Sequence, residues 1–372
     1  MKEFSIPEGT RDLILGECRA KRALQYAIEG VFDSYGYRDI VTPSIEFYQT
    51  YQTGFDNLRD EQMYKFFDHN GKILTLRMDM TVPIARVVAT KFKDQKPPFR
   101  FRYCANVYKV KESFAGKRNE VSDCGIELIG LQDTQSDLEI LLCALEVMDV
   151  MKQPYTLEIG NVNFFHSACA ELKLQEEEIS RLADLIDRKS LSELGDYLKE
   201  LRLDEEQRSF FLQLPWLCGD EEVLESAKAY CFNEELTKIL TTLEELNAQL
   251  KALGYDKQIT FDLGKVPHLN YYSGLIFEGF IEGIGTSVLS GGRYDTLLEK
   301  FGDALPAIGF SVKLDYVLPV LNKEESDVKT VTMCYPPQDK VEALRKAKEL
   351  RSRYRVELHC CDVADIVVKG EM

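Results

Sequence analysis

The clearest alternation of apolar and polar residues lies near the middle of the chain, in two strand-forming runs separated by a loop. Residues 101–108 and 121–129 are rich in aromatic and β-branched side chains, and the loop between them contains glycine. This pattern predicts a long antiparallel hairpin. Asp123 and Glu127 lie four residues apart on the returning strand, so their side chains point to one face of the sheet. Basic residues cluster at the loop end, at Lys109, Lys111, Lys117 and Arg118. The hairpin is interpreted either as a ligand-binding surface or as a solvated hairpin of mixed charge.

The same patterns predict elements on both sides of the hairpin. Helices are expected over 20–35, 82–91, 136–152 and 339–354, and strands over 36–48, 62–69, 72–77, 155–161, 328–336 and 355–363. Asn70-Gly71 is a strong turn signal between two of these strands. Residues 164–254 are almost wholly helical in pattern, and strand formers return over 259–321.

This order of elements predicts a core, an insertion and a short C-terminal segment. The core is expected from residues 1–163 and 255–322, and the helical insertion from residues 164–254. Residues 328–372 are expected to form a truncated α/β segment. The charged runs of the insertion are interpreted as solvated helix faces.

A candidate binding segment lies where the strand that ends in LTLR meets the next helix. Asp79 and Thr81 occupy this junction, close to Arg77. Either side chain could cap the helix that begins at residue 82, whose second position is Pro83. Capping explains each residue singly, but it does not explain why Arg77 and Asp79 stand together.

Composition and charge exclude several classes of function. The net charge of −16 argues against a nucleic acid as the principal partner, because phosphate contacts need a basic patch. No apolar run reaches the roughly 18 residues of a membrane span, and the N-terminal stretch MKEFSIPEGTRD lacks the apolar core of a signal peptide. Ten cysteines without a CxxC pair, together with four scattered histidines, predict a cytoplasmic protein without a metal site or cofactor.

Five sequence blocks, taken in order, resemble the class II aminoacyl-tRNA synthetase core of histidyl-tRNA synthetase. They are GYRDIVTPSIE, LTLRMDMT, FRFRYCANVYKVKE, PHLNYYSGLIFE and GGRYDTLLEKFG with PAIGFSVKLDYVL. The first, third and fifth are similar to the three class II motifs, and the resemblance covers roughly residues 5–321. It implies an α+β fold with a six- or seven-stranded antiparallel sheet flanked by helices, a helical insertion, and a homodimer built through the first motif.

Departures from the synthetase pattern fall on the groups that activate an amino acid. Lys109 stands in place of the motif-two arginine, and Lys111 replaces the acidic residue two positions later. Tyr316 replaces the motif-three arginine, and Pro267 replaces the arginine that opens the histidyl signature. Adenylate formation needs preorganised positive charge, and one such loss typically costs about 10²–10³ in rate. The resemblance therefore implies a chain that has lost activation.

The chain is also similar to a second family, the regulatory subunits of ATP phosphoribosyltransferase. The segment RMDMTVPIAR matches that family more closely than the synthetase's RPEGT, although Met78 departs from its usual proline. The segment after residue 328 is too short for a complete anticodon-binding domain. This resemblance implies a non-catalytic partner of the short catalytic subunit in the first step of histidine biosynthesis, with histidine as effector and no tRNA.

The resemblance also implies a histidine-binding site. Asp79 and Thr81 would bind the α-amino group, Glu127 and Tyr271 would orient the imidazole, and Tyr272 would line the pocket. Lys109 would bind the carboxylate of histidine, and Asp123 would complete the site at a position where the synthetase has glutamine. Core packing is the alternative for the two tyrosines. Two other functions stay open: an active histidyl-tRNA synthetase, and a synthetase-like amino-acid-binding scaffold with another protein partner.

Overall fold

The computed structural model describes residues 4–55, 58, 60–110, 118–172, 174–266, 272–321, 329–362 and 365–369. Contacts divide the chain into two compact units, Met1–Leu321 and Asn322–Met372. The helical stretch belongs to the first unit, and the boundaries predicted for core, insertion and C-terminal segment stay predictions. No helix among the described residues is both long and apolar enough to cross a membrane.

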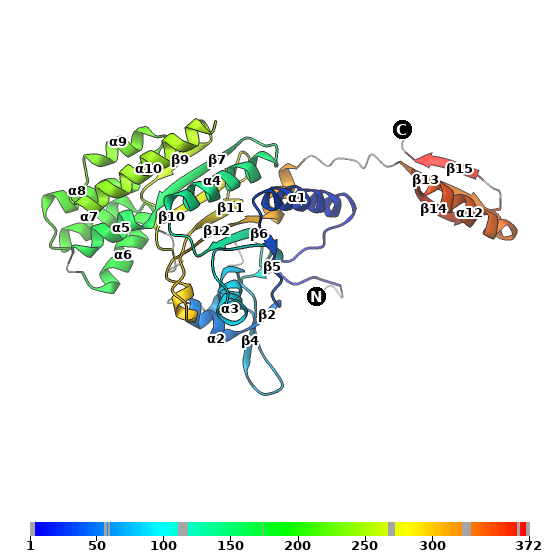
Figure 1. Cartoon of the computed structure of the whole chain (residues 1–372), viewed down its shortest axis with the longest axis horizontal. Coiled ribbons are helices and arrows are strands. Elements are labelled where there is room, and N and C mark those ends of the chain that lie inside the picture. Colours follow the sequence, from blue (N-terminus) through cyan, green and yellow to red (C-terminus); the bar gives the residue numbers. More distant parts are fainter. Residues whose placement is uncertain are drawn as a thin grey trace. The chain divides into compact units, whose positions relative to one another are not determined.

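A nine-stranded sheet forms the centre of the first unit (Figure 1). Its spatial order is β1 (Arg38–Asp39), β5 (Phe99–Tyr108), β6 (Glu120–Ile129), β12 (Ala307–Lys313), β11 (Leu289–Arg293), β10 (Leu275–Ile281), β7 (Tyr155–Asn161), β9 (Ile259–Asp262) and β8 (Cys218–Gly219). Neighbours are antiparallel except β1 with β5 and β7 with β9. The six or seven strands that the family resemblance implied were too few, because two-residue strands, β1 and β8, extend the sheet at its two edges.

The predicted central hairpin is confirmed as β5 and β6, which pair from Phe99–Ile129 to Tyr108–Glu120. Its two faces separate two apolar clusters. Phe101 and Tyr103 of β5 pack in the cluster below the sheet, whereas Ile126 and Leu128 of β6 are fully buried in the larger cluster beneath the helices. The side chains of Asp123 and Glu127 point away from those helices, as the strand period requires.

Helices α1 (Leu15–Ser34) and α4 (Thr134–Asp149) cover one face of the sheet (Figure 1). Ile28 and Phe32 of α1 are fully buried, and Asp133 caps α4 by accepting a hydrogen bond from the Ser136 amide at 2.8 Å. Both predicted helices are confirmed, but α1 begins five residues before the expected residue 20. Its first turn contains no buried residue and therefore adds nothing to the apolar stripe that marked the helix.

A small three-stranded sheet lies between α1 and the central hairpin in the sequence. Its order is β2 (Ile45–Phe47), β4 (Ile73–Leu76) and β3 (Lys65–Phe67). The predicted hairpin around Asn70-Gly71 is confirmed, and Gly71 has the positive φ of 79° that this turn requires. Helices α2 (Tyr48–Gly54) and α3 (Thr81–Lys91) pack against each other beside this sheet.

The helical stretch gathers beside β7 and β9 at one end of the central sheet (Figure 1). Its helices are α5 (Val162–Ala170), α6 (Glu176–Asp187), α7 (Leu191–Glu200), α8 (Glu205–Gln213), α9 (Glu222–Lys228) and α10 (Glu234–Ala252). Buried leucines along α10, at Leu236, Leu240, Leu243 and Leu250, join this stretch to the main core.

The second unit is a small three-stranded sheet with one helix. The strands β13 (Thr330–Tyr335) and β14 (Arg355–Cys360) are parallel, and α12 (Lys340–Leu350) connects them. These elements confirm the predicted strand, helix and strand. The antiparallel strand β15 (Asp365–Lys369), which completes the sheet, was not predicted.

Candidate functional site

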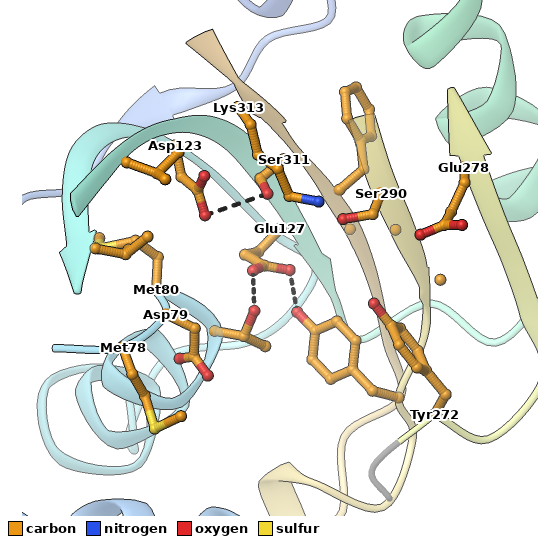
Figure 2. A pocket seen from close by; sticks show the side chains of 18 of the residues that line it. Met78, Asp79, Met80, Asp123, Glu127, Tyr272, Glu278, Ser290, Ser311 and Lys313 are labelled. Atoms are coloured by element: carbon orange, nitrogen blue, oxygen red, sulfur yellow. Dashed lines mark hydrogen bonds between the residues drawn. The ribbon is translucent and has the colours of Figure 1, made fainter. Parts of the chain in front are cut away.

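A cavity of about 320 Å³ lies on the face of the central sheet that α1 and α4 leave uncovered (Figure 2). The predicted site residues that the structure describes all line it: Asp79, Thr81, Lys109, Asp123, Glu127 and Tyr272. Tyr271, Pro267 and Lys111 lie outside the described residues. Residues separated by almost 200 positions in the sequence thus line one pocket. The histidine site implied by the family resemblance needs this proximity.

Glu127 is the most deeply placed carboxylate of the cavity, with only 2% of its surface exposed. Thr81 Oγ1 donates a hydrogen bond to its Oε1 at 2.8 Å, and the Tyr294 hydroxyl donates to its Oε2 (Figure 2). Gly309 makes room for this carboxylate, because a Cβ at Gly309 would overlap Oε2. Burial raises the pKa of Glu127 to about 7, although the two hydrogen bonds oppose the shift. The Glu127 carboxyl therefore changes between its protonated and ionised forms near neutral pH.

Asp79 both caps a helix and faces the cavity. Its Oδ1 accepts a hydrogen bond from the Val82 amide at 3.1 Å, which is the capping contact that the sequence left open. Its Oδ2 is buried and has no hydrogen-bond partner among the described residues. Burial raises the pKa of Asp79 to about 6, and the charge of Lys109 partly offsets this effect. One oxygen thus supports the fold, and the other remains to accept a ligand's hydrogen bond.

The neighbours of Asp79 have separate tasks. The Thr81 hydroxyl is engaged by Glu127, so Thr81 does not cap the helix with its side chain. Arg77 is buried and donates to the carbonyl oxygens of Asn106, at 2.7 Å, and Thr42, at 2.9 Å. Arg77 therefore fastens the segment that carries Asp79 to β5. This structural role explains why the two residues stand together.

Polar and cationic side chains line the side of the cavity near the loop end of the hairpin. Ser311 Oγ donates to Asp123 Oδ2 across a long contact of 3.5 Å (Figure 2). Lys109, Arg118 and Lys313 lie among the lining residues of the same cavity. Arg118 also pairs with the buried Asp315 at 3.3 Å. Positive groups therefore lie in the same cavity as the carboxylates of Asp79, Asp123 and Glu127.

Two glycines within β11 let aromatic rings approach the sheet. A Cβ at Gly292 would lie 2.8 Å from the ring of Tyr272, and a Cβ at Gly291 would overlap Phe310. The structure places both glycines inside the strand, where they make room for the wall of the cavity.

Two residues that line the cavity, Tyr294 and Lys265, were not among the predicted site residues. Tyr294 follows the glycine pair directly, and its position in the GGRYD block was the available signal. Lys265 bridges Glu158, at 2.7 Å, and Glu278, which stand directly opposite each other on β7 and β10. Two like charges in that register repel each other, and the single charge of Lys265 offsets part of this repulsion. No local sequence pattern reveals the pair.

The arrangement suits a small polar ligand that carries both charges. Carboxylates at Asp79 and Glu127 accept N–H groups, and the basic residues of the cavity attract an anion. Among the described lining residues, no three His, Cys, Asp or Glu side chains converge closely enough to hold a metal ion. The lining thus offers a ligand hydrogen-bond acceptors together with groups of both charges.

Sequence comparisons point to a single group of proteins. The sequence model of the histidyl-tRNA synthetase family matches residues 9–317. An ATP phosphoribosyltransferase regulatory subunit of Acetivibrio thermocellus is 36% identical over 360 residues, which cover 95% of this chain and 86% of that protein. A protein of the same name from Clostridium botulinum is 33% identical, with 96% and 86% covered.

Solved structures agree with this grouping. A Bacillus halodurans protein described as an ATP phosphoribosyltransferase regulatory subunit/histidyl-tRNA synthetase superposes with a TM-score of 0.86 at 30% identity. The match covers 96% of this chain and 93% of that one. The histidyl-tRNA synthetase of Nostoc matches with a TM-score of 0.77 at 22% identity, covering 96% and 86%. At that identity the second match shows a shared fold and no more.

Proposed function

This chain belongs to the family of ATP phosphoribosyltransferase regulatory subunits, and from that membership we propose that it binds histidine in the sheet cavity and transmits feedback control to the catalytic subunit. One observation carries the proposal. Two buried carboxylates, Asp79 and Glu127, lie in one cavity with basic groups, a combination that complements the charges of an amino acid with an imidazole side chain.

Each end of histidine has a matching group. Glu127 accepts the imidazole N–H at the buried end, where the Tyr294 hydroxyl also contacts this carboxylate. The expected second partner of the imidazole, Tyr271, lies outside the described residues. Asp79 offers Oδ2 to the α-amino group, and Lys109 is close enough to influence the pKa of Asp79 and to meet the ligand's carboxylate. Tyr272 and Asp123 complete the lining.

The chain contributes no chemistry in this proposal. Lys109 lines the cavity where the synthetase pattern has an arginine, and a lysine offers a point charge instead of a bidentate fork. Tyr316, at the second arginine position, is half-buried and packs against apolar clusters of the core. Both substitutions weaken the charge that a reacting phosphate needs, which supports loss of amino-acid activation.

The proposed assembly is a homodimer that joins the short-form catalytic subunit in the cytoplasm. Apolar side chains on the segment that resembles the first class II motif are exposed in the single chain: Val41 to 91%, Phe47 to 48% and Ile45 to 46%. A second copy of the chain would cover them. Ten free thiols suit a reducing compartment.

The test uses the chain purified with the short catalytic subunit from the same source. We expect phosphoribosyltransferase activity to rise when the chain is added and to fall again with histidine, and calorimetry to detect histidine bound to the complex. No change in activity with the chain would overturn the regulatory role. ATP–pyrophosphate exchange that depends on histidine would instead support an active histidyl-tRNA synthetase.

A further inference from the structure

A cluster of metal-ligand side chains lies on the other face of the central sheet, beneath α1. Cys104 of β5, Cys124 of β6 and Glu29 of α1 bring two sulfur atoms and a carboxylate oxygen within 4.8 Å of one another. Cys124 is fully buried, whereas Cys104 and Glu29 are half-buried. The cluster is therefore closed on the sheet side and reachable from the helix side.

The pairing of β5 and β6 places the two sulfur atoms together. Cys104 and Cys124 stand directly opposite each other in the register. Even-numbered residues of β5 direct backbone groups away from β6, since the Tyr108 amide donates to Arg77 and the Arg102 carbonyl accepts from Ile40. The two cysteines are therefore a non-hydrogen-bonded pair, whose Cα atoms are typically about 4.5 Å apart and whose side chains are close.

Neighbouring side chains orient the third ligand. Gln25, one turn earlier on α1, donates from Nε2 to Glu29 Oε1 at 2.8 Å. Arg102, on the same face of β5 as Cys104, donates from Nη1 to the Glu29 carbonyl oxygen at 2.9 Å. Such outer contacts fix ligating carboxylates in metal sites. Here they hold this turn of α1 over the cysteine pair.

We propose that Glu29, Cys104 and Cys124 form a binding site for one thiophilic divalent cation of the Zn²⁺ class, with water as the fourth ligand. Tetrahedral zinc with bonds of about 2.3 Å to sulfur and about 2.1 Å to oxygen places its donor atoms about 3.6–3.8 Å apart. Side-chain movements of about 1 Å bring the three groups to that spacing. Binding releases the two thiol protons to solvent, because the thiolate is the form that ligates a metal.

A metal bound here would depart from the expectation of a chain without one. That expectation rested on the absence of CxxC spacing and on scattered histidines, whereas here the strand register and a helix bring the ligands together. The site also has a structural consequence. Cys124 lies between Asp123 and Glu127 on β6, so a bound ion would fasten α1 to the strand that forms the floor of the cavity.

The test is titration of the reduced full-length chain with Co²⁺, followed by displacement with Zn²⁺. We expect one Co²⁺ per chain at this site, with a thiolate-to-cobalt charge-transfer band that disappears when Zn²⁺ is added. Cys104→Ser and Cys124→Ser should each abolish the band. Glu29→Gln, on the accessible side of the site, should keep the fold and weaken binding by more than the roughly 10- to 100-fold typical of outer-shell changes.

Other cysteines provide the controls. Cys143→Ser and Cys169→Ser replace buried thiols in α4 and α5 and should bind like the parent. Cys361→Ser is the control for the thiols of the C-terminal unit and should also bind like the parent. Binding that disappears only in this variant would overturn the proposal. Reduced protein that takes up no metal, even if oxidation joins Cys104 to Cys124, would overturn it too.

Discussion

Replacing Glu127 by glutamine should weaken histidine binding and, at the same time, stabilise the free protein at alkaline pH. The change is nearly isosteric, so Thr81 can still donate to the side-chain oxygen. It removes the charge that the imidazole N–H would meet. A hydrogen bond to a charged group contributes about 1.5–3 kcal/mol, so affinity should fall roughly 10- to 150-fold.

The stability effect follows from the raised pKa of Glu127. The value of about 7 lies above the ordinary 4.5, so between these values the folded state holds a proton that the unfolded state has lost. The free energy of unfolding of the parent therefore decreases as pH rises through this window. The shift corresponds to about 3 kcal/mol. Glutamine has no such proton, so its stability should not change with pH in this way. As pH rises from about 4.5 to about 7, the free energy of unfolding of the variant should therefore increase by about that much relative to the parent's.

Two measurements on the same samples test this reasoning. Histidine calorimetry is performed at about pH 8, where Glu127 is ionised in the parent. Chemical unfolding is then followed across the window. The matched control is Glu120→Gln, at the start of the same strand, where the carboxylate accepts from Asn106 Nδ2 and does not line the cavity. Parent-like histidine affinity in Glu127→Gln, with the control also unchanged, would refute the site assignment.

Three further outcomes are expected. Gly309→Ala should cost about 1–3 kcal/mol of stability by overpacking and should lower histidine affinity at least tenfold in calorimetry, because the new methyl group overlaps the Glu127 carboxylate; unchanged affinity would contradict the placement of that group. Asp79→Asn should keep its contact with the Val82 amide but present an N–H to the ligand's amine, so histidine binding should weaken while the thermal midpoint stays within a few degrees of the parent. Val41→Glu should shift light scattering from dimer towards the 42.6 kDa monomer, and a dimer of parental stability would place the interface elsewhere.

Local sequence patterns predicted the central hairpin because its information is local. Alternation along β5 and β6 fixes which residues share a face, and Asp123 and Glu127 were placed on one face by spacing alone. The edge strand β8 escaped prediction because two residues have no alternation, and the strand predicted over 36–48 divides into the short strands β1 and β2. Their pairing is decided by what the neighbouring strand offers, which is a property of the folded sheet.

The site shows the same division between local and non-local information. Family motifs named Asp79 and Glu127, but the partner of Glu127 was missed because Tyr294 lies 167 residues away. Lys265 was missed for a similar reason, since its two carboxylates come from separate strands. The Cys104–Cys124 pair was missed too. Counting from the predicted strand ends, 108 and 121, would have set Gly125 opposite Cys104, so the pairing of the two cysteines emerges only from the register of the folded sheet.

Feedback control requires histidine to bind two states of the chain unequally, and the contacts of Glu127 indicate where such states could differ. This carboxylate accepts from Thr81, the first residue of α3, and from Tyr294, four residues before the short helix Leu298–Phe301. These two helices pack against each other, and α2 packs on both. An imidazole N–H that binds Glu127 must share or displace one of those donors. We therefore expect histidine to act first on α3, and through α2 on the small sheet, where Phe67 is 72% exposed and available to a neighbouring subunit.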